Sequence, residues 1–144
     1  LALGRLDQAE SAYRNVLRVN ANSEAAELGL AKVLIRKGQL VEAEPKLREI
    51  SERNSVEIGA EATYWLGFIQ QRTNQNSEAL ETYSRVRVLF EAYDEWVSMS
   101  MVRTAEIQRA QGNTSEARAT YRSVIERYPN SAAADIARRV IEGN

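Results

Sequence analysis

Gly112-Asn113-Thr114-Ser115-Glu116-Ala117 is a stretch of sequence that also occurs, with small changes, at three earlier places in the chain. The other copies occupy residues 4–9, 38–43 and 74–79. Each copy ends in an alanine, which is followed four residues later by a large side chain and three residues after that by a β-branched one. The alanines are Ala9, Ala43, Ala79 and Ala117, the large residues are Tyr13, Leu47, Tyr83 and Tyr121, and the β-branched residues are Val16, Ile50, Val86 and Val124.

This spacing places the three side chains of each copy on one face of an α-helix. The small alanine lets a second helix cross closely, and the large residue fills the space one turn further on. A Gly or Asn stands five residues before each alanine, where it suits the left-handed backbone with which a preceding helix ends and the chain reverses. Each copy is therefore predicted to be the second helix of a helical hairpin, and successive alanines lie 34, 36 and 38 residues apart.

The helix limits follow from this frame. Second helices are expected at about 5–19, 40–53, 77–91 and 114–128, first helices at about 23–37, 57–73 and 95–111, and a final helix at about 131–142. Residues 54–57 and 113–116 resemble helix starts in which a glutamate reaches back to the first residue. Pro45 lies past the first turn of its helix, where it should remove one hydrogen bond and bend the helix.

The sequence resembles the tetratricopeptide repeat family, whose period is about 34 residues. Residues 60–67 carry the Leu66-Gly67 pair of the family's first helix, although Thr63 replaces the usual Trp. Residues 24–36 and 98–110 fall in the same frame, with Ala31 and Ala105 at the small position, and Tyr128-Pro129-Asn130-Ser131 matches the proline between repeats.

The resemblance implies an all-α fold, a right-handed superhelix (α-solenoid) of antiparallel helix pairs within a single domain over residues 1–144. About three and a half repeats are expected, followed by a capping helix. They are a partial repeat at 1–22, repeats at 23–56, 57–93 and 94–130, and the capping helix at 131–142.

Composition excludes several classes of function. The net charge of −1 argues against nucleic-acid binding, which needs an excess of Lys and Arg. The chain has no Cys and no His, so it lacks the commonest metal ligands and the side chain best suited to proton transfer near neutral pH. No apolar run approaches the ~20 residues that span a bilayer. We therefore expect no catalytic residues, no metal, no cofactor and no membrane insertion: the protein is not predicted to be an enzyme.

Three phased carboxylates could suggest a functional array, but each lies in the first turn of a second helix. They are Glu42, Glu78 and Glu116. Negative charge at that place is favoured by the helix dipole, so a structural role is the better interpretation.

The family frame predicts the partner-binding face. Tyr64, Trp65 and Phe68 fall on the stripe that lines the concave groove in this family, with basic residues at its edges. The predicted groove comprises Leu28, Lys32, Ile35, Arg36, Tyr64, Trp65, Phe68, Arg72, Val102, Arg103, Glu106 and Arg109. Aromatic side chains beside Arg are typical of binding hot spots. The alternatives are that these aromatics are core, because aromatic stripes at helical spacing usually are, and that the basic residues form a solvated face.

Some family members clamp a carboxylate with Lys, Asn and Arg, but here only Arg103 matches that pattern. Leu28, Lys32, Trp65 and Met99 stand at the other positions, which favours a more apolar ligand.

A second cluster comprises Phe90, Tyr93, Trp96 and Val97, at the longest turn between repeats. It is interpreted either as a docking knob or, preferably, as packing that seals this turn.

The predicted function is a non-catalytic scaffold that binds a peptide or helix of a partner protein in the concave groove. The alternative is an assembly module that stacks copies through exposed repeat edges into a homo-oligomer. The chain begins with Leu1 inside a hairpin, as expected for a fragment of a larger bacterial-type protein of the family. The Tyr-Pro-Asn-Ser ending and the long repeats resemble bacterial cell-envelope members, which implies the periplasm or envelope, with the cytoplasm as the alternative compartment.

Overall fold

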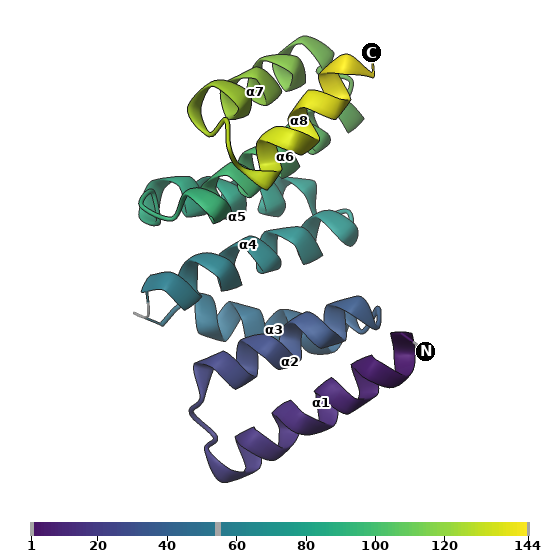
Figure 1. The fold of residues 1–144 in the computed structure, drawn as a ribbon, viewed down its shortest axis with the longest axis vertical. Coiled ribbons are helices and arrows are strands. Elements are labelled where there is room, and N and C mark those ends of the chain that lie inside the picture. Colours follow the sequence, from purple (N-terminus) through teal and green to yellow (C-terminus); the bar gives the residue numbers. More distant parts are fainter. Residues whose placement is uncertain (1, 54–55, 144) are drawn as a thin grey trace.

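The computed structural model describes residues 2–53 and 56–143, and over these residues it forms eight α-helices and no strand. The helices follow one another through short turns and stack along one axis (Figure 1). They are α1 (Ala2–Val19), α2 (Glu24–Arg36), α3 (Leu40–Ser51), α4 (Val56–Arg72), α5 (Asn76–Leu89), α6 (Asp94–Ala110), α7 (Thr114–Arg127) and α8 (Ala132–Glu142).

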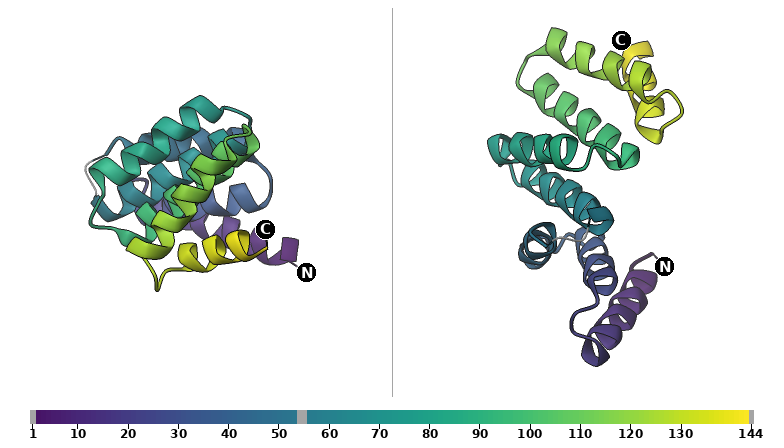
Figure 2. Two further views of the ribbon diagram at one scale, coloured as in Figure 1. Left: turned by 90° about the horizontal axis from the view of Figure 1, so that it is seen from above. Right: turned by 90° about the vertical axis from the view of Figure 1, so that its left-hand side faces the viewer.

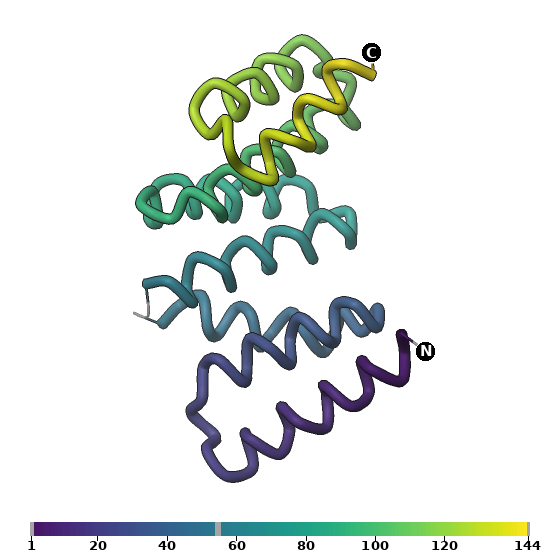
Figure 3. The backbone as a smooth tube through the Cα atoms, viewed as in Figure 1, coloured from purple at the N-terminus to yellow at the C-terminus, as the bar shows by residue number. Residues whose placement is uncertain are grey.

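The stack has two rows of helices. The even-numbered helices contact one another in succession, α2 with α4, α4 with α6 and α6 with α8. Within the described residues the odd-numbered helices make no such contacts and pack only on their even-numbered neighbours. The even row is therefore the inner, shorter face of the stack, and the odd row is the outer face (Figures 2 and 3). The predicted all-α helical repeat solenoid is confirmed.

The predicted turn residues are confirmed at three of four places. Gly38 and Gly112 have φ of 79° and 86°, and Asn74 has φ of 61°, all in the left-handed region that ends a helix and reverses the chain. The prediction is wrong for Gly4, which lies inside α1 because residues 2 and 3 already belong to the same helix.

The helix starts differ from the predicted caps. Asn113 precedes α7, but its side chain makes no capping hydrogen bond. The Glu116 carboxylate accepts a hydrogen bond from Gln108 Nε2 (3.2 Å) instead of reaching back. The cap predicted at 54–57 lies partly outside the described residues. Helix α3 continues through the exposed Pro45 to Ser51.

The repeated stripe of alanine, large residue and β-branched residue forms the core of α3, α5 and α7. All nine side chains in those helices are buried, with Ala43, Tyr83 and Val124 at 0% exposure. In α1 the same stripe is only partly covered, and Val16 is 46% exposed. The difference arises because α1 packs on one neighbour, α2, whereas α3, α5 and α7 each pack between two helices.

A close and fully buried helix crossing lies between α4 and α5. A Cβ atom on Gly67 would come within 2.7 Å of Tyr83 Cε1, and Tyr83 is fully buried. The family's Leu-Gly pair therefore serves here to admit the Tyr83 ring. At Gly29 a Cβ would meet the Tyr13 ring at 2.4 Å, but Tyr13 is only half-buried.

Gly67→Ala should destabilise the fold by about 1–3 kcal/mol, because the Tyr83 ring has nowhere to move. Gly29→Ala should cost less, despite the closer approach, because Tyr13 can rotate toward solvent. Gly4→Ala serves as the control: nothing lies within 4 Å of that site, and Ala in place of Gly in a helix adds up to about 1 kcal/mol. Urea unfolding followed by circular dichroism measures all three, and equal costs at Gly29 and Gly67 would contradict this account.

Candidate functional site

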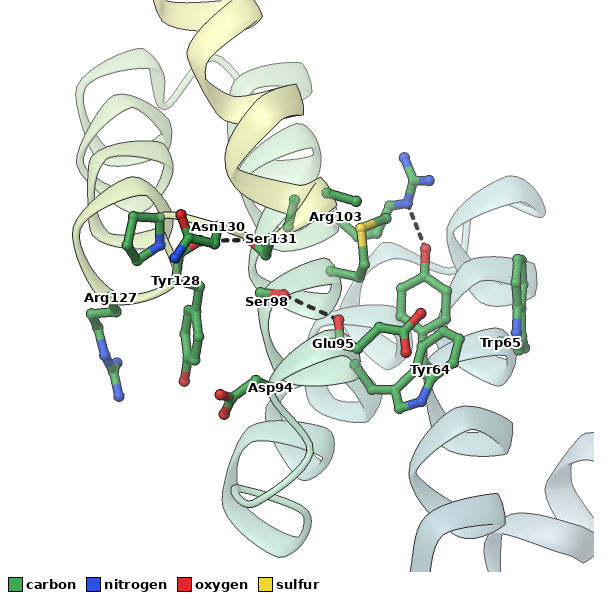
Figure 4. Close-up of a pocket in the computed structure, with 15 residues that line it drawn as sticks. Tyr64, Trp65, Asp94, Glu95, Ser98, Arg103, Arg127, Tyr128, Asn130 and Ser131 are labelled. Atoms are coloured by element: carbon green, nitrogen blue, oxygen red, sulfur yellow. Dashed lines mark hydrogen bonds between the residues drawn. The ribbon is translucent and has the colours of Figure 1, made fainter.

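The inner face carries a cleft of about 670 Å³ between α4, α6 and the start of α8 (Figure 4). Its walls are mainly aromatic and apolar: Trp65 and Tyr64 come from α4, Trp96 and Met99 from α6, and Tyr128 from the end of α7. The remaining lining residues are Asp94, Glu95, Ser98, Arg103, Arg127, Pro129, Asn130, Ser131, Ala132 and Ala133. Ser131 begins α8, and its Oγ accepts a hydrogen bond from the Ala134 N–H (3.0 Å), which fixes the turn that forms this wall.

The structure divides the predicted groove residues by their exposure. Leu28, Tyr64 and Val102 lie in the hydrophobic core, at 6%, 1% and 0% exposure, and of these Tyr64 also lines the cleft. Each is covered because the neighbouring inner helix packs over its stripe. The other nine reach the surface: Lys32, Ile35, Trp65, Phe68, Arg103 and Glu106 are partly exposed, and Arg36, Arg72 and Arg109 are exposed.

Only three of the predicted residues line the cleft, namely Tyr64, Trp65 and Arg103. The predicted groove residues in α2 lie outside the cleft, because the cleft opens toward α8 instead. These residues are Leu28, Lys32, Ile35 and Arg36. The groove predicted from the sequence did not include residues 127–133, which form one wall of the cleft. The repeat spacing could have indicated this wall, because continuing the spacing to α8 places the first turn of that helix beside α6.

The second aromatic cluster is divided between core and cleft. Val97 is buried at 4%, and the Phe90 ring packs on Gly59 of α4. The Phe90 contact joins the turn before α6 to α4. Trp96 packs on Tyr64, with ring centroids 5.4 Å apart, and also lines the cleft.

The aromatic rings of α4 brace one another. Tyr64 and Trp65 meet edge to face, with centroids 5.0 Å apart and planes at 76°. Trp65 and Phe68 do the same at 5.4 Å and 88°. Edge-to-face pairs are favourable beyond their buried area, so Trp65 is presented to the cleft in a fixed orientation.

A hydrogen-bonded chain of side chains runs from the cleft into the core. Arg103 donates from Nε to the Tyr64 hydroxyl (3.0 Å) and from NH1 to Glu106 Oε1 (2.6 Å). The other oxygen of Glu106 accepts from Gln71 Nε2 (3.1 Å), and the Tyr83 hydroxyl donates to Gln71 Oε1 (2.8 Å). Burial raises the pKa of Tyr64 and of Tyr83. Burial acts to lower the pKa of Arg103, but Tyr64 and Glu106 outweigh it and the net shift is upward, so this guanidinium is held charged.

The basic residues of the predicted groove are largely engaged by the protein itself. Lys32 Nζ pairs with Glu61 Oε2 at 2.7 Å, and the same oxygen accepts from Trp65 Nε1 (3.1 Å). Arg103 is paired with Glu106. The guanidinium groups of Arg72 and Arg103 lie 5.6 and 5.3 Å from the centroid of the Phe68 ring.

The described residues contain neither a metal-binding cluster of carboxylates nor a membrane-spanning helix. Over 2–53 and 56–143, no three or more Asp and Glu side chains cluster so as to hold a metal ion. Within the same ranges, none of the helices combines the length and the apolar character needed to cross a membrane.

Two family models, both described as tetratricopeptide repeat, match the chain. One matches residues 61–90 and 99–131, and the other matches residues 1–57. The protein belongs to the tetratricopeptide repeat family. Repeats of this family are, in general, non-catalytic protein-interaction modules.

Individual proteins are similar to this chain at low sequence identity. Cellulose synthase 1 operon protein C of Komagataeibacter xylinus is 28% identical over 119 residues, which are 79% of this chain and 8% of that protein. The chain thus spans a small part of this relative's length. The crystal structure of MamA has a TM-score of 0.70 at 23% identity and covers 89% of this chain and 71% of its own. A tetratricopeptide repeat protein from Parabacteroides merdae ATCC 43184 has a TM-score of 0.72 at 15% identity, covering 98% and 54%.

A third solved structure is YrrB, described as a TPR protein with an unusual peptide-binding site. It has a TM-score of 0.61 at 20% identity, and the match covers 89% of this chain and 63% of that one.

Tyr64→Phe should destabilise the fold by about 0.5–1.5 kcal/mol, because it removes the acceptor of Arg103 Nε without changing the packing of the ring. Tyr128→Phe is the matched control, since within the described residues the Tyr128 hydroxyl makes no hydrogen bond. Its effect should stay within about 0.5 kcal/mol. Urea unfolding of both variants measures the difference, and an equal loss would show that the Tyr64–Arg103 bond contributes nothing.

Proposed function

We propose that this protein is a non-catalytic scaffold whose inner face binds a peptide or helix of a partner protein, with the cleft between α4, α6 and α8 as its centre. The observation that carries the proposal is the cleft itself. It has the size of a ligand site, about 670 Å³, and combines apolar walls with a few polar groups, as binding pockets do.

The side chains of the cleft suit the recognition of an apolar or aromatic residue. Trp65, Trp96, Met99 and Tyr128 are partly exposed there. Exposed aromatic side chains that are already fixed lose little conformational entropy when they bind a partner. Trp65 is braced by Tyr64 and Phe68, as described above, and Trp96 by Tyr64.

The comparisons support the same class of function. The family is one of protein-interaction repeats, and YrrB, with a TM-score of 0.61, is described as having a peptide-binding site. The predicted groove residues outside the cleft, such as Phe68, Arg72 and Ile35, would then extend the surface along the inner row toward α2.

The alternative function is assembly through a repeat edge, and the exposure of α1 favours it. On this helix Leu3, Val16 and Val19 are 61%, 46% and 91% exposed, although Val16 belongs to the stripe that is buried in the other outer helices. A second copy, or another protein of a bacterial cell-envelope complex, would cover this face. The molar mass from light scattering would then rise with concentration; a constant monomer mass would contradict self-assembly.

Met99→Arg should abolish peptide binding while the fold is retained, because a charged side chain would enter the apolar part of the cleft. The test uses peptides selected on the wild-type chain from a phage-displayed random library, with affinity measured by fluorescence anisotropy. A loss of about thirtyfold or more is expected, as for a binding hot spot.

Val41→Arg is the matched control, because Val41 is 91% exposed on the outer helix α3. Both variants are first shown to be folded by circular dichroism. If the selected peptides bind both variants as well as they bind wild type, the binding face lies outside the cleft and the proposal is wrong.

A further inference from the structure

The charged groups of the cleft differ in how far the protein neutralises them. Arg103 at one end is held by the Tyr64 hydroxyl and by Glu106, at 3.0 and 2.6 Å. Asp94 and Glu95, in the first turn of α6, are both exposed. Within the described residues their carboxylates enter no hydrogen bond or ion pair. The cleft therefore offers free negative charge at Asp94 and Glu95, whereas the positive charge of Arg103 is already paired.

The two carboxylates lie where a bound segment would meet them. Figure 4 shows Glu95 beside the Tyr64 ring and Asp94 on the side of α6 nearer Tyr128, while the Arg103 guanidinium lies beyond the hydroxyl end of the Tyr64 ring. Glu95 and Arg103 are eight residues apart on one helix, about 12 Å along its axis. A cation can thus approach the carboxylates without meeting Arg103.

The remaining charged group of the lining is Arg127. Its guanidinium lies 5.6 Å from the centroid of the Tyr128 ring. It also lines a separate hollow with Arg87 and Val88 of α5, so it stands on the rim between two surfaces. With Arg103 paired to Glu106, two free carboxylates face this single guanidinium, and the local balance stays negative.

The walls beside the carboxylates also favour a cation. Trp96, Trp65 and Tyr128 line the same cleft as Asp94 and Glu95. Aromatic faces attract Lys and Arg side chains through the ring quadrupole, most strongly for Trp. Carboxylates and indole rings together form a site that suits a basic side chain, while Met99 offers an apolar contact next to it.

We propose that the cleft binds a segment of a partner protein in which a lysine or arginine stands beside an apolar residue. This inference rests on the proposed binding function of the cleft and specifies the partner. The basic groove residues Lys32 and Arg103 do not favour an acidic partner segment, because they are already engaged by Glu61 and Glu106. The acidic first turn of α6 also suits the helix dipole, so the test separates that structural role from recognition.

The experiment uses the peptides selected on the wild-type chain and the variant Asp94→Asn, Glu95→Gln. Peptides that lose binding to Met99→Arg are taken as cleft-dependent. These should be enriched in Lys or Arg, and their affinity for the neutral variant should fall about tenfold. Their affinity for wild type should also weaken as salt is raised, because the carboxylates are exposed.

The control variant is Glu78→Gln, Glu81→Gln, which removes two exposed carboxylates near the start of the outer helix α5. It should leave the affinity of these peptides unchanged, and thermal unfolding shows whether either variant perturbs the fold. A charge exchange completes the test: Asp94→Lys, Glu95→Lys should bind versions of the peptides in which the basic residue is replaced by Glu.

The outcomes separate the two proposals. Cleft-dependent peptides that bind the neutral variant as tightly as wild type, or that are enriched in Asp and Glu, would overturn the inference about charge and leave the cleft function standing. If no selected peptide depends on Met99, the proposed function is wrong and this inference falls with it.

Discussion

The close crossing of α4 and α5 is the contact on which the inner face depends. At this crossing the buried Tyr83 ring occupies the space that a side chain at residue 67 would need. The Tyr83 hydroxyl in turn donates a hydrogen bond to Gln71, and Gln71 donates a hydrogen bond to Glu106 of the next inner helix. The packing within one hairpin is thereby tied to the spacing between successive inner helices, α4 and α6. The position of the cleft walls follows from that spacing.

The fold could be predicted from the sequence because its determinants are local and periodic. Alanine, a large residue and a β-branched residue recur in phase, and a stripe of that kind leaves little choice of partner face. The turn residues Gly38, Asn74 and Gly112 mark where helices end. Gly4 lies inside a helix instead of ending one, and the Asn113 side chain forms no cap. A motif of a few residues therefore does not determine the local structure by itself.

The site was harder to predict because it forms between repeats. Tyr64 and Trp65 are adjacent in the sequence and both line the cleft, yet Tyr64 is 1% exposed and Trp65 is partly exposed, since Trp96 of α6 packs over Tyr64. Lys32 and Glu61 pair across two inner helices and 29 positions of sequence. Neither contact is visible in the pattern of a single helix. The family frame predicts a face for binding, but only the stacking decides which side chains on that face remain exposed.

In a solenoid each repeat contacts only its neighbours, so a ligand stabilises mainly the elements that it bridges. The walls of the cleft come from α4, α6, α7 and α8, whereas, among the helices of the described residues, α1 contacts only α2. A bound segment would therefore couple the last two hairpins and α8 to one another and leave α1 unaffected. Recognition and cohesion of the stack would then be the same event in α4 to α8.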